Sequence, residues 1–470
     1  MEYKHQIQQV GGKANGYIFS LLSLFVVLMI TQLIEGHPSI LVVGCGALLI
    51  GYLLIRLSTP KGNRSESYRL WVIFYLIYFA FMSLTNFVYV DDPYVDFFYI
   101  YDSIDFYSTI DSILRRNSDL EMYNNVLYEA RNWKGFGVIS WLLGVFAYFL
   151  GDVNNIVIQK TQNVFVCGLT IVYLYNIGRT YFSHQRSWLI ATSFGLLTHI
   201  FVFASAYGRD THILLFYTIA FYVFLQKWRA RNIFTLVLLG IITGLFRLQH
   251  GIFFLFIVLG YIFLRVTHLR SKVAAYILGI VGVIVFSIFL FLNMDAYQNE
   301  TIGKLEHYQE YHNEKFEEAS GLTGVVAKLP VAFQPVANMI ISQTYPIPPY
   351  RVVRVGNINS NQYLKFPLGI AQVYWMIVLI MLVYVGGFRG YWKIVPKELL
   401  FAFGIAVALI FAVSIGSYEY RRMLPAYPIV YLTAAICYFG LKKSDRRSIT
   451  MKIWISLFAI YGVYFLLKGF

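Results

Sequence analysis

Charged residues are scarce in this sequence. Only 13% of its 470 residues are charged, whereas 58% are hydrophobic, and soluble globular chains carry about 25% charged residues. The strict alternation of apolar and polar side chains that marks a membrane β-barrel is also missing. Long apolar runs recur from Gly16 onward, many near the roughly 20 residues that a spanning helix needs. The sequence therefore predicts an all-α polytopic membrane protein, because a helix satisfies its own backbone hydrogen bonds in hydrocarbon.

Cysteine is also rare, and its placement argues against both a disulfide framework and a cysteine metal site. Cys45, Cys167 and Cys437 all lie inside apolar runs, where cysteine usually acts as a small hydrophobic residue. Neither a disulfide framework nor a metal-ligand spacing is visible. The first apolar run is long enough to span and lacks a small-residue cleavage site, so no cleavable signal peptide is expected. No internal repeat is obvious, and an inverted-repeat transporter therefore has no direct support.

Thirteen apolar segments are predicted to span the membrane. They are 16–34, 38–57, 69–90, 158–177, 187–206, 210–226, 232–249, 251–267, 273–293, 366–386, 398–416, 421–441 and 452–469. A further apolar segment, 136–150, is too short to span comfortably and is expected to lie on the outer membrane surface as an amphipathic helix. Four parts follow from this map: an N-terminal hairpin (1–68), a membrane core (69–293), a large outer loop (294–365) and C-terminal membrane helices (366–470).

Basic residues set the expected orientation, because Lys and Arg accumulate in cytoplasmic segments. With the N-terminus inside and 136–150 outside, the inner segments hold 22 of the 38 Lys and Arg residues. These segments are the N-terminus and the loops near 56–69, 179–186, 227–231, 265–272, 389–397 and 442–452. The net charge of +14 is thereby explained by membrane orientation, without nucleic acid. Two long loops, 91–157 and 294–365, then lie outside.

The first outer loop gathers nine acids between Asp91 and Glu129, among many tyrosines. A carboxylate at a membrane surface can act as a general base on a substrate hydroxyl, or hold a divalent cation against a diphosphate. The alternative is an ordinary solvated loop, and no residue is assigned as a metal ligand. The catalytic candidates in this loop are Asp91, Asp92, Asp102 and Asp105.

Three short outer turns carry arginine: in the first, an Arg and an Asp at membrane depth are costly and usually pair or mark a site, and the other two break the rule that short outer turns lack arginine. The three turns contain Arg209 with Asp210, Arg247 with His250, and Glu419 with Arg421 and Arg422. Arginine binds phosphate oxygens bidentately, so a phosphate ligand would explain these cations. Two alternatives stay open: the first pair could close a helical hairpin, and the histidine could be a packed side chain. Arg351 and Arg354 in the second outer loop are further candidates for substrate binding.

The order of these features resembles that of the C-type membrane glycosyltransferases. An acidic, Tyr-rich first outer loop precedes an interfacial helix, and the sequence GRD follows at the next outer turn. The stretch Asp102-Ser103 with Tyr107 looks like a motif of that superfamily, and EYRRMLPAYP resembles its C-terminal Arg-and-Pro segment. The resemblance implies a GT-C-like fold, with Asp102 or Asp105 as the base and Asp210 as a second acid.

A second resemblance is to the bacterial polymerases of O-antigen and exopolysaccharide repeat units. Arg209 and His250 stand where those enzymes have an arginine and a histidine that open successive spans. Asp210 replaces their usual glutamine, and two extra spans precede the acidic loop. The resemblance implies an enzyme of the bacterial inner membrane with a periplasmic active site. Its substrate would be a sugar or oligosaccharide linked to polyprenyl phosphate or diphosphate, and a chain-length regulator would be a partner.

Two other functions stay open at this point. One is a C-type enzyme that transfers a single sugar from a polyprenyl-phosphate donor. The other is a flippase of the lipid-linked glycan, which would carry charges along a central cavity at mid-membrane. The predicted spans are nearly free of charge, and charges gather at their outer ends. This distribution favours chemistry at one face over alternating access.

The distribution of Lys and Arg along the sequence makes a testable prediction of the membrane topology. Single cysteines at positions 102, 210 and 350 are expected to react with a membrane-impermeant maleimide from outside, because these positions lie in outer segments. Cysteines at positions 227 and 443 are expected to react only after the cells are opened. Labelling of position 227 from outside without labelling of position 210 would invert the map.

Overall fold

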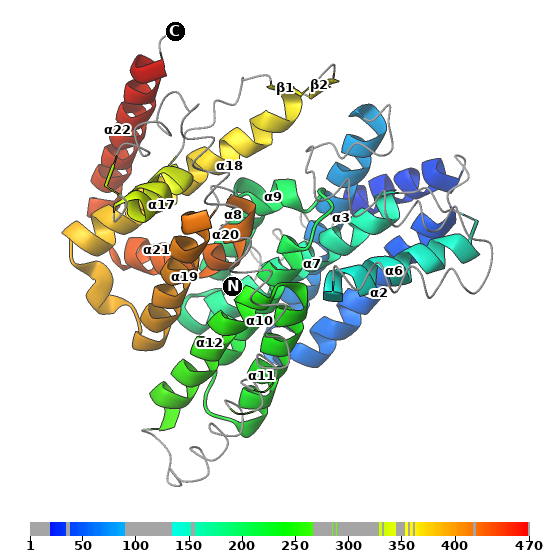
Figure 1. Cartoon of the computed structure of the whole chain (residues 1–470), viewed down its shortest axis with the longest axis horizontal. Coiled ribbons are helices and arrows are strands. Elements are labelled where there is room, and N and C mark those ends of the chain that lie inside the picture. The colour runs from blue at the N-terminus through cyan, green and yellow to red at the C-terminus, as the bar shows by residue number, and fades with distance from the viewer. Residues whose placement is uncertain are drawn as a thin grey trace, which may run out of the picture. The chain divides into compact units, whose positions relative to one another are not determined.

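The structure is a computed structural model of the whole chain (Figure 1). It describes residues 19–33, 38–89, 134–151, 156–266, 284, 288, 329–330, 333–344, 353–355, 358–360, 362–416 and 420–468. In these ranges the chain is helical, apart from one antiparallel ladder of two three-residue strands, β1 and β2. It forms two compact units, one of residues 1–176, 200–215 and 352–364, the other of residues 177–199, 216–351 and 365–470.

The first unit contains the earlier helices. Its elements are a helix over Phe19–Leu33, α2 (Pro38–Ser58), η1 (Lys61–Asn63), α3 (Arg64–Tyr89), α6 (Lys134–Phe149), most of α7 (Ile156–Tyr181), α9 (Ile200–Phe203), the first turns of α10 (Asp210–Phe224), β1 (Val353–Val355) and β2 (Ile358–Ser360). The strands pair with Val353 opposite Ser360.

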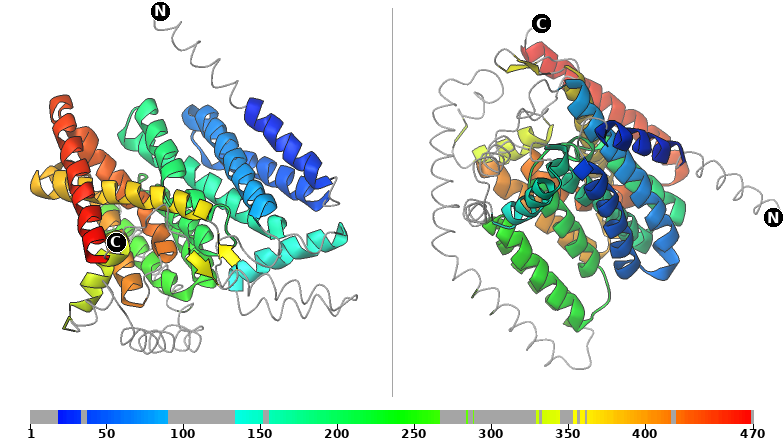
Figure 2. Two further views of the ribbon diagram at one scale, coloured as in Figure 1. Left: turned by 90° about the horizontal axis from the view of Figure 1, so that it is seen from above. Right: turned by 90° about the vertical axis from the view of Figure 1, so that its right-hand side faces the viewer.

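The second unit contains the later helices. Its elements are α8 (His184–Leu197), the rest of α10, α11 (Ala230–Phe246), α12 (Leu248–Val266), α17 (Gln334–Thr344), most of α18 (Gln362–Met381), η4 (Leu382–Phe388), η5 (Tyr391–Ile394), α19 (Lys397–Gly416), α20 (Tyr420–Met423), η6 (Leu424–Ala426), α21 (Tyr427–Gly440) and α22 (Lys443–Lys468). The green helices α11 and α12 run side by side (Figure 1). Helix α22, which is red in Figure 2, lies beside η4, since Lys452 of α22 donates a hydrogen bond to the Tyr384 hydroxyl.

Six of the described helices are long and apolar enough to cross a membrane. They are Pro38–Ser58, Lys61–Thr85, Leu248–Arg265, Pro367–Phe388, Lys397–Ser414 and Arg421–Gly440. The chain is thus a helical membrane protein, as the sequence predicts. The total of thirteen spans stays a prediction, because 273–293 lies outside the described residues and other predicted spans correspond to shorter or more polar helices. Segment 136–150 is helical as expected and forms α6.

Trp71 organises the packing of the first unit. Its indole is fully buried in α3 and donates a hydrogen bond to the Leu48 carbonyl of α2 at 3.0 Å. A Cβ atom added at Gly51 of α2 would overlap the indole ring, and one added at Gly168 of α7 would lie 2.8 Å from it. Two glycines on neighbouring helices therefore make the space that the ring fills. Close backbone approach at small residues is a common way for membrane helices to pack.

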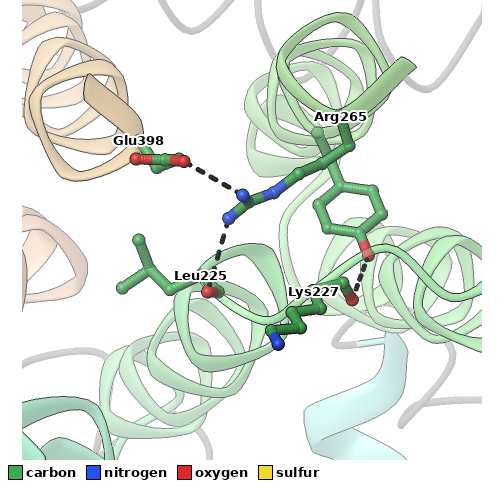
Figure 3. A network of polar contacts seen from close by, with 5 residues as sticks. Leu225, Lys227, Arg265 and Glu398 are labelled. Carbon is green, nitrogen blue, oxygen red and sulfur yellow. Dashed lines mark hydrogen bonds and ion pairs between the residues drawn. The ribbon is translucent and has the colours of Figure 1, made fainter. Parts of the chain in front are cut away.

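One end of the second unit is held by an ion pair that joins α12 to α19 (Figure 3). Arg265 lies 3.0 Å from the Glu398 carboxylate and donates a second hydrogen bond to the Leu225 carbonyl at 3.4 Å. The Tyr261 hydroxyl donates to the Lys227 carbonyl at 3.0 Å. The end of α10, the start of α19 and the hairpin of α11 and α12 therefore meet at one place.

Further basic segments join this end of the second unit. Burial and the nearby Glu398 raise the pKa of Tyr181 to about 12, while Arg265 acts in the opposite direction. The Phe182 ring lies 5.5 Å from the Phe439 ring, and a Cβ at Gly440 would overlap Ile394. Arg265 and the segments 179–186, 227–231, 389–397 and 442–452 thus gather at one end, which we call the basic end. The distribution of Lys and Arg along the sequence assigns Arg265 and these four segments to the same side of the membrane.

The packing of Trp71 predicts the effect of two matched substitutions. Gly51→Ala is expected to lower the free energy of unfolding by about 1–3 kcal/mol, because its methyl group would overlap a buried ring. Gly46→Ala on the same helix is the control, because a Cβ there meets nothing within 4 Å and alanine favours helix. Thermal midpoints in detergent would measure both. Equal midpoints for the two variants would contradict the described packing.

Candidate functional site

The turn Gly208-Arg209-Asp210 of the first unit lies against α7, and the preceding Tyr207 lies against α6. Asn163 of α7 donates a hydrogen bond from Nδ2 to the Gly208 carbonyl at 3.0 Å. The preceding Tyr207 is fully buried and donates from its hydroxyl to Ser140 Oγ of α6 at 2.7 Å, and burial raises its pKa. The segment expected at the membrane surface therefore contacts the residue that immediately precedes the GRD turn.

Asp210 occupies the first turn of α10 and is 7% exposed. A carboxylate at a helix N-terminus is stabilised by the helix dipole and by free backbone amides. This placement gives Asp210 a structural role in starting α10, whatever its chemistry. Arg209 immediately before it is half-buried.

The start of α7 carries a polar surface that the sequence interpretation treated as part of a plain span. Lys160 is fully buried, and it lies among the buried polar residues Gln159, Thr161, Gln162 and Asn163. Gln159 Nε2 donates to the Ser140 carbonyl at 3.0 Å, and Gln162 Nε2 lies 3.3 Å from Ser140 Oγ. The run QKTQN at 159–163 inside an apolar segment was the signal that could have marked this surface. An ionisable residue in such a position usually belongs to a functional site.

Arg247 separates α11 from α12 in the second unit. Its backbone is extended (φ −154°, ψ 117°), so α11 ends there, and its side chain is only 9% exposed. His250 lies one turn later and is buried, with its Nδ1 3.2 Å from the Tyr217 hydroxyl of α10. The structure thus packs the His250 ring against Tyr217, and a role of His250 in substrate binding stays a prediction.

Arg247 lies far from the basic end of its unit. α11 begins beside Lys227, and α12 ends at the Arg265 ion pair. The tip of the hairpin therefore stands one helix length away, which for 17 residues is roughly 25 Å. The membrane orientation that explains the basic loops at the basic end does not explain why Arg247 is buried at the opposite end of the unit.

Arg421 and Arg422 form α20 and are both half-buried. Pro425 follows within the 3-10 turn η6, where its missing N–H interrupts the helix before α21. α19 connects this region to the basic end, since Glu398 lies at its start and Ser414 near its finish. Ser414 Oγ is 3.5 Å from Ser342 Oγ of α17. Arg247 and the Arg421–Arg422 pair therefore share the end of the second unit away from the basic loops.

Helix α17 brings part of the second long loop to Met423, in the same short helix as these two arginines. Gln343 Nε2 donates a hydrogen bond to the Met423 sulfur at 2.7 Å, and Gln343 Oε1 accepts one from Trp375 Nε1 at 3.0 Å. Gln372 Nε2 donates to the Gln343 carbonyl at 2.9 Å and its Oε1 lies 3.1 Å from His199 Nε2. A buried polar network thus supports α20 from α17, α18 and the end of α8.

Several predicted site residues lie outside the described residues. They are Asp91, Asp92, Asp102, Asp105, Arg351 and Glu419. Arg354 lies in β1, but its side chain is not among those described. Within the described ranges no group of three His, Cys, Asp or Glu side chains could hold a metal ion, and the acidic loop falls outside those ranges.

Comparison with models of known protein families and with curated proteins finds no match to this sequence.

Proposed function

We propose that this chain is a membrane glycosyltransferase that uses a polyprenyl-linked sugar or glycan at the outer face of a bacterial inner membrane. Stated most specifically, the proposed reaction is the polymerisation of the repeat units of a surface polysaccharide. The observation that carries the proposal is the placement of arginines. Arg247 is buried where α11 ends, and Arg421 and Arg422 open the α20–α21 segment. All three lie at the end of the second unit away from its basic loops.

Phosphate binding is the chemistry that suits these arginines. A guanidinium group binds phosphate oxygens with two parallel hydrogen bonds and is less strongly hydrated than an ammonium group. The phosphates of a polyprenyl-linked donor lie at the membrane surface, at the level of helix ends. Arginines held there would bind the donor and stabilise the negative charge that develops on the leaving phosphate.

A carboxylate would supply the other half of the reaction. It would remove the proton of the acceptor hydroxyl, whose oxygen then attacks the anomeric carbon of the donor sugar. The bond from that carbon to the phosphate oxygen breaks, and the lipid phosphate or diphosphate leaves. Asp102 and Asp105 of the first outer loop are the proposed bases. Asp210, at the start of α10, is the second acid.

A first prediction compares arginines at the two ends of the second unit. Arg421→Ala is expected to reduce activity by roughly ten- to a hundredfold, because a lost charge-assisted hydrogen bond costs about 1.5–3 kcal/mol. Arg231→Ala is the control, since Arg231 is exposed in the first turn of α11, at the basic end. The measurement is the chain-length profile of surface polysaccharide, at matched membrane levels, in cells that lack the natural gene. Equal effects of the two changes would remove the case for a phosphate site at Arg421.

A second prediction concerns the acids. Asp102→Asn, Asp105→Asn and Asp210→Asn each keep the side-chain volume but cannot accept a proton. A general base contributes typically 10²–10⁴-fold, so the variant at the true base is expected to lose nearly all activity while still folding. For a polymerase, the cells would then display polysaccharide of one repeat unit.

The same experiment separates the three functions. A variant of a single-sugar transferase would leave long chains that lack one decoration, and a flippase variant would trap the lipid-linked units inside the cell. Normal long chains from all three asparagine variants would show that the acidic loop and Asp210 are not catalytic.

A further inference from the structure

The segment η4 of the second unit is a π-helix, and its wider turn brings an arginine beside a tyrosine. The Arg389 N–H donates a hydrogen bond to the Tyr384 carbonyl, five residues earlier, at 3.1 Å. This i to i+5 hydrogen bond defines a π-helix, a rare form that occurs frequently at functional sites. The Arg389 side chain is close enough to interact with the Tyr384 hydroxyl. The widened turn therefore places a cation next to that hydroxyl.

A second cation reaches the same hydroxyl from α22. Lys452 donates a hydrogen bond from Nζ to the Tyr384 hydroxyl at 3.0 Å, and its ammonium group lies 5.4 Å from the centre of the Tyr384 ring. Both Lys452 and Arg389 are exposed. Within the described parts of the chain, no carboxylate forms an ion pair with either of them. Two positive charges therefore meet at one hydroxyl without an acid to neutralise them.

The surroundings of this cluster are apolar and exposed. Phe388 is 82% exposed and its ring lies 6.1 Å from that of Tyr384, while Met451 and Ile455 flank Lys452 on α22 and are exposed as well. Tyr384 lies close to the end of the candidate span Pro367–Phe388, where tyrosine usually meets the lipid head groups. Lysine and arginine at such a level lay their stems along apolar surface and keep their charged groups at the interface.

The cluster belongs to the basic end of the second unit. Arg389 begins the segment 389–397 and Lys452 ends the segment 442–452, and both segments are predicted to face the cytoplasm. The cytoplasmic leaflet carries the anionic lipids that attract basic residues near the membrane surface. An anionic head group is therefore the ligand that this position would offer to the two cations.

We propose that Tyr384, Arg389 and Lys452 form a binding site for the head group of an anionic phospholipid of the inner leaflet. The two cations bind the phosphate, the Tyr384 hydroxyl donates a hydrogen bond to a phosphate oxygen, and the acyl chains lie along the exposed apolar side chains nearby. A choline head group is disfavoured because it would bring a third positive charge to the cluster. This site lies at the opposite end of the unit from Arg247 and does not depend on the proposed function.

Tyr384→Phe and Lys452→Gln test the site in the full-length protein in detergent. Arg447→Gln is the control, because Arg447 is exposed on the same helix and its loss changes the net charge as Lys452→Gln does. Five residues separate the two positions, which places them on different sides of α22 at 3.6 residues per turn. The probes are dioleoylphosphatidylglycerol, dioleoylphosphatidylcholine and inorganic phosphate. Thermal midpoints are measured without a probe and across a titration of each.

The wild-type protein is expected to be stabilised by phosphatidylglycerol more than by phosphatidylcholine or inorganic phosphate. Tyr384→Phe is expected to weaken binding of phosphatidylglycerol about three- to tenfold, the range for one hydrogen bond, without any change of charge. Lys452→Gln should weaken it roughly ten- to a hundredfold, because its hydrogen bond to phosphate is charge-assisted. Arg447→Gln should weaken it no more than about fivefold, the effect of one cation near an anionic surface. Lys452→Arg keeps the charge and should bind the lipid as the wild type does.

Three results would overturn this site. Equal stabilisation by the two lipids, or equal stabilisation by inorganic phosphate and phosphatidylglycerol, would exclude selection of an anionic lipid. Equal losses of affinity in Lys452→Gln and Arg447→Gln, with none in Tyr384→Phe, would reduce the effect to general surface charge. Lower midpoints of the two site variants without a probe, together with an unchanged response to phosphatidylglycerol, would make the contact of Lys452 with Tyr384 purely structural.

Discussion

Hydrocarbon offers no hydrogen-bond partner to a peptide group, and this constraint shapes the whole chain. A spanning segment must satisfy its backbone internally, so it becomes a helix. Polar and charged side chains are costly within such segments and concentrate where helices end or break. The arrangement of the described residues follows from this rule. Arg265 and Glu398 pair at one end of the second unit, and Arg247 occupies the break between α11 and α12.

The positions where helices break therefore indicate the candidate site better than the helix interiors do. The extended residue Thr198 ends α8, and Arg247 ends α11 in the same conformation. Pro425 forces the 3-10 turn η6 just after the two arginines of α20. Each break frees backbone groups that need other partners, and each lies beside a buried polar side chain such as His199 or His250. A site built from such breaks would bind charged groups at the membrane surface without placing charges inside the bilayer.

Part of the candidate site was visible in the sequence and part was not. Arg247 and Arg421 could be singled out from the sequence because they lie in predicted outer turns, where the bias of Lys and Arg toward the inner side does not account for them. The surface of α7 was missed, since an apolar average over 158–177 hides the run of polar residues that begins at Gln159. The support of α20 by Gln343 was also out of reach. It depends on a contact between Gln343 of α17 and Met423, two residues that are 80 positions apart in the chain.

The sequence by itself determined that the chain is a helical membrane protein and which basic segments of the second unit lie together, since both depend on composition and on the order of apolar runs. Hydropathy and charge act locally, so they can be summed along a chain without knowledge of its packing. Only the tertiary structure decided that Trp71 lies between Gly51 and Gly168, that Lys160 is buried, and that His250 packs against Tyr217. Such pairings depend on which faces of distant helices meet, and side-chain shape rather than hydropathy selects those faces.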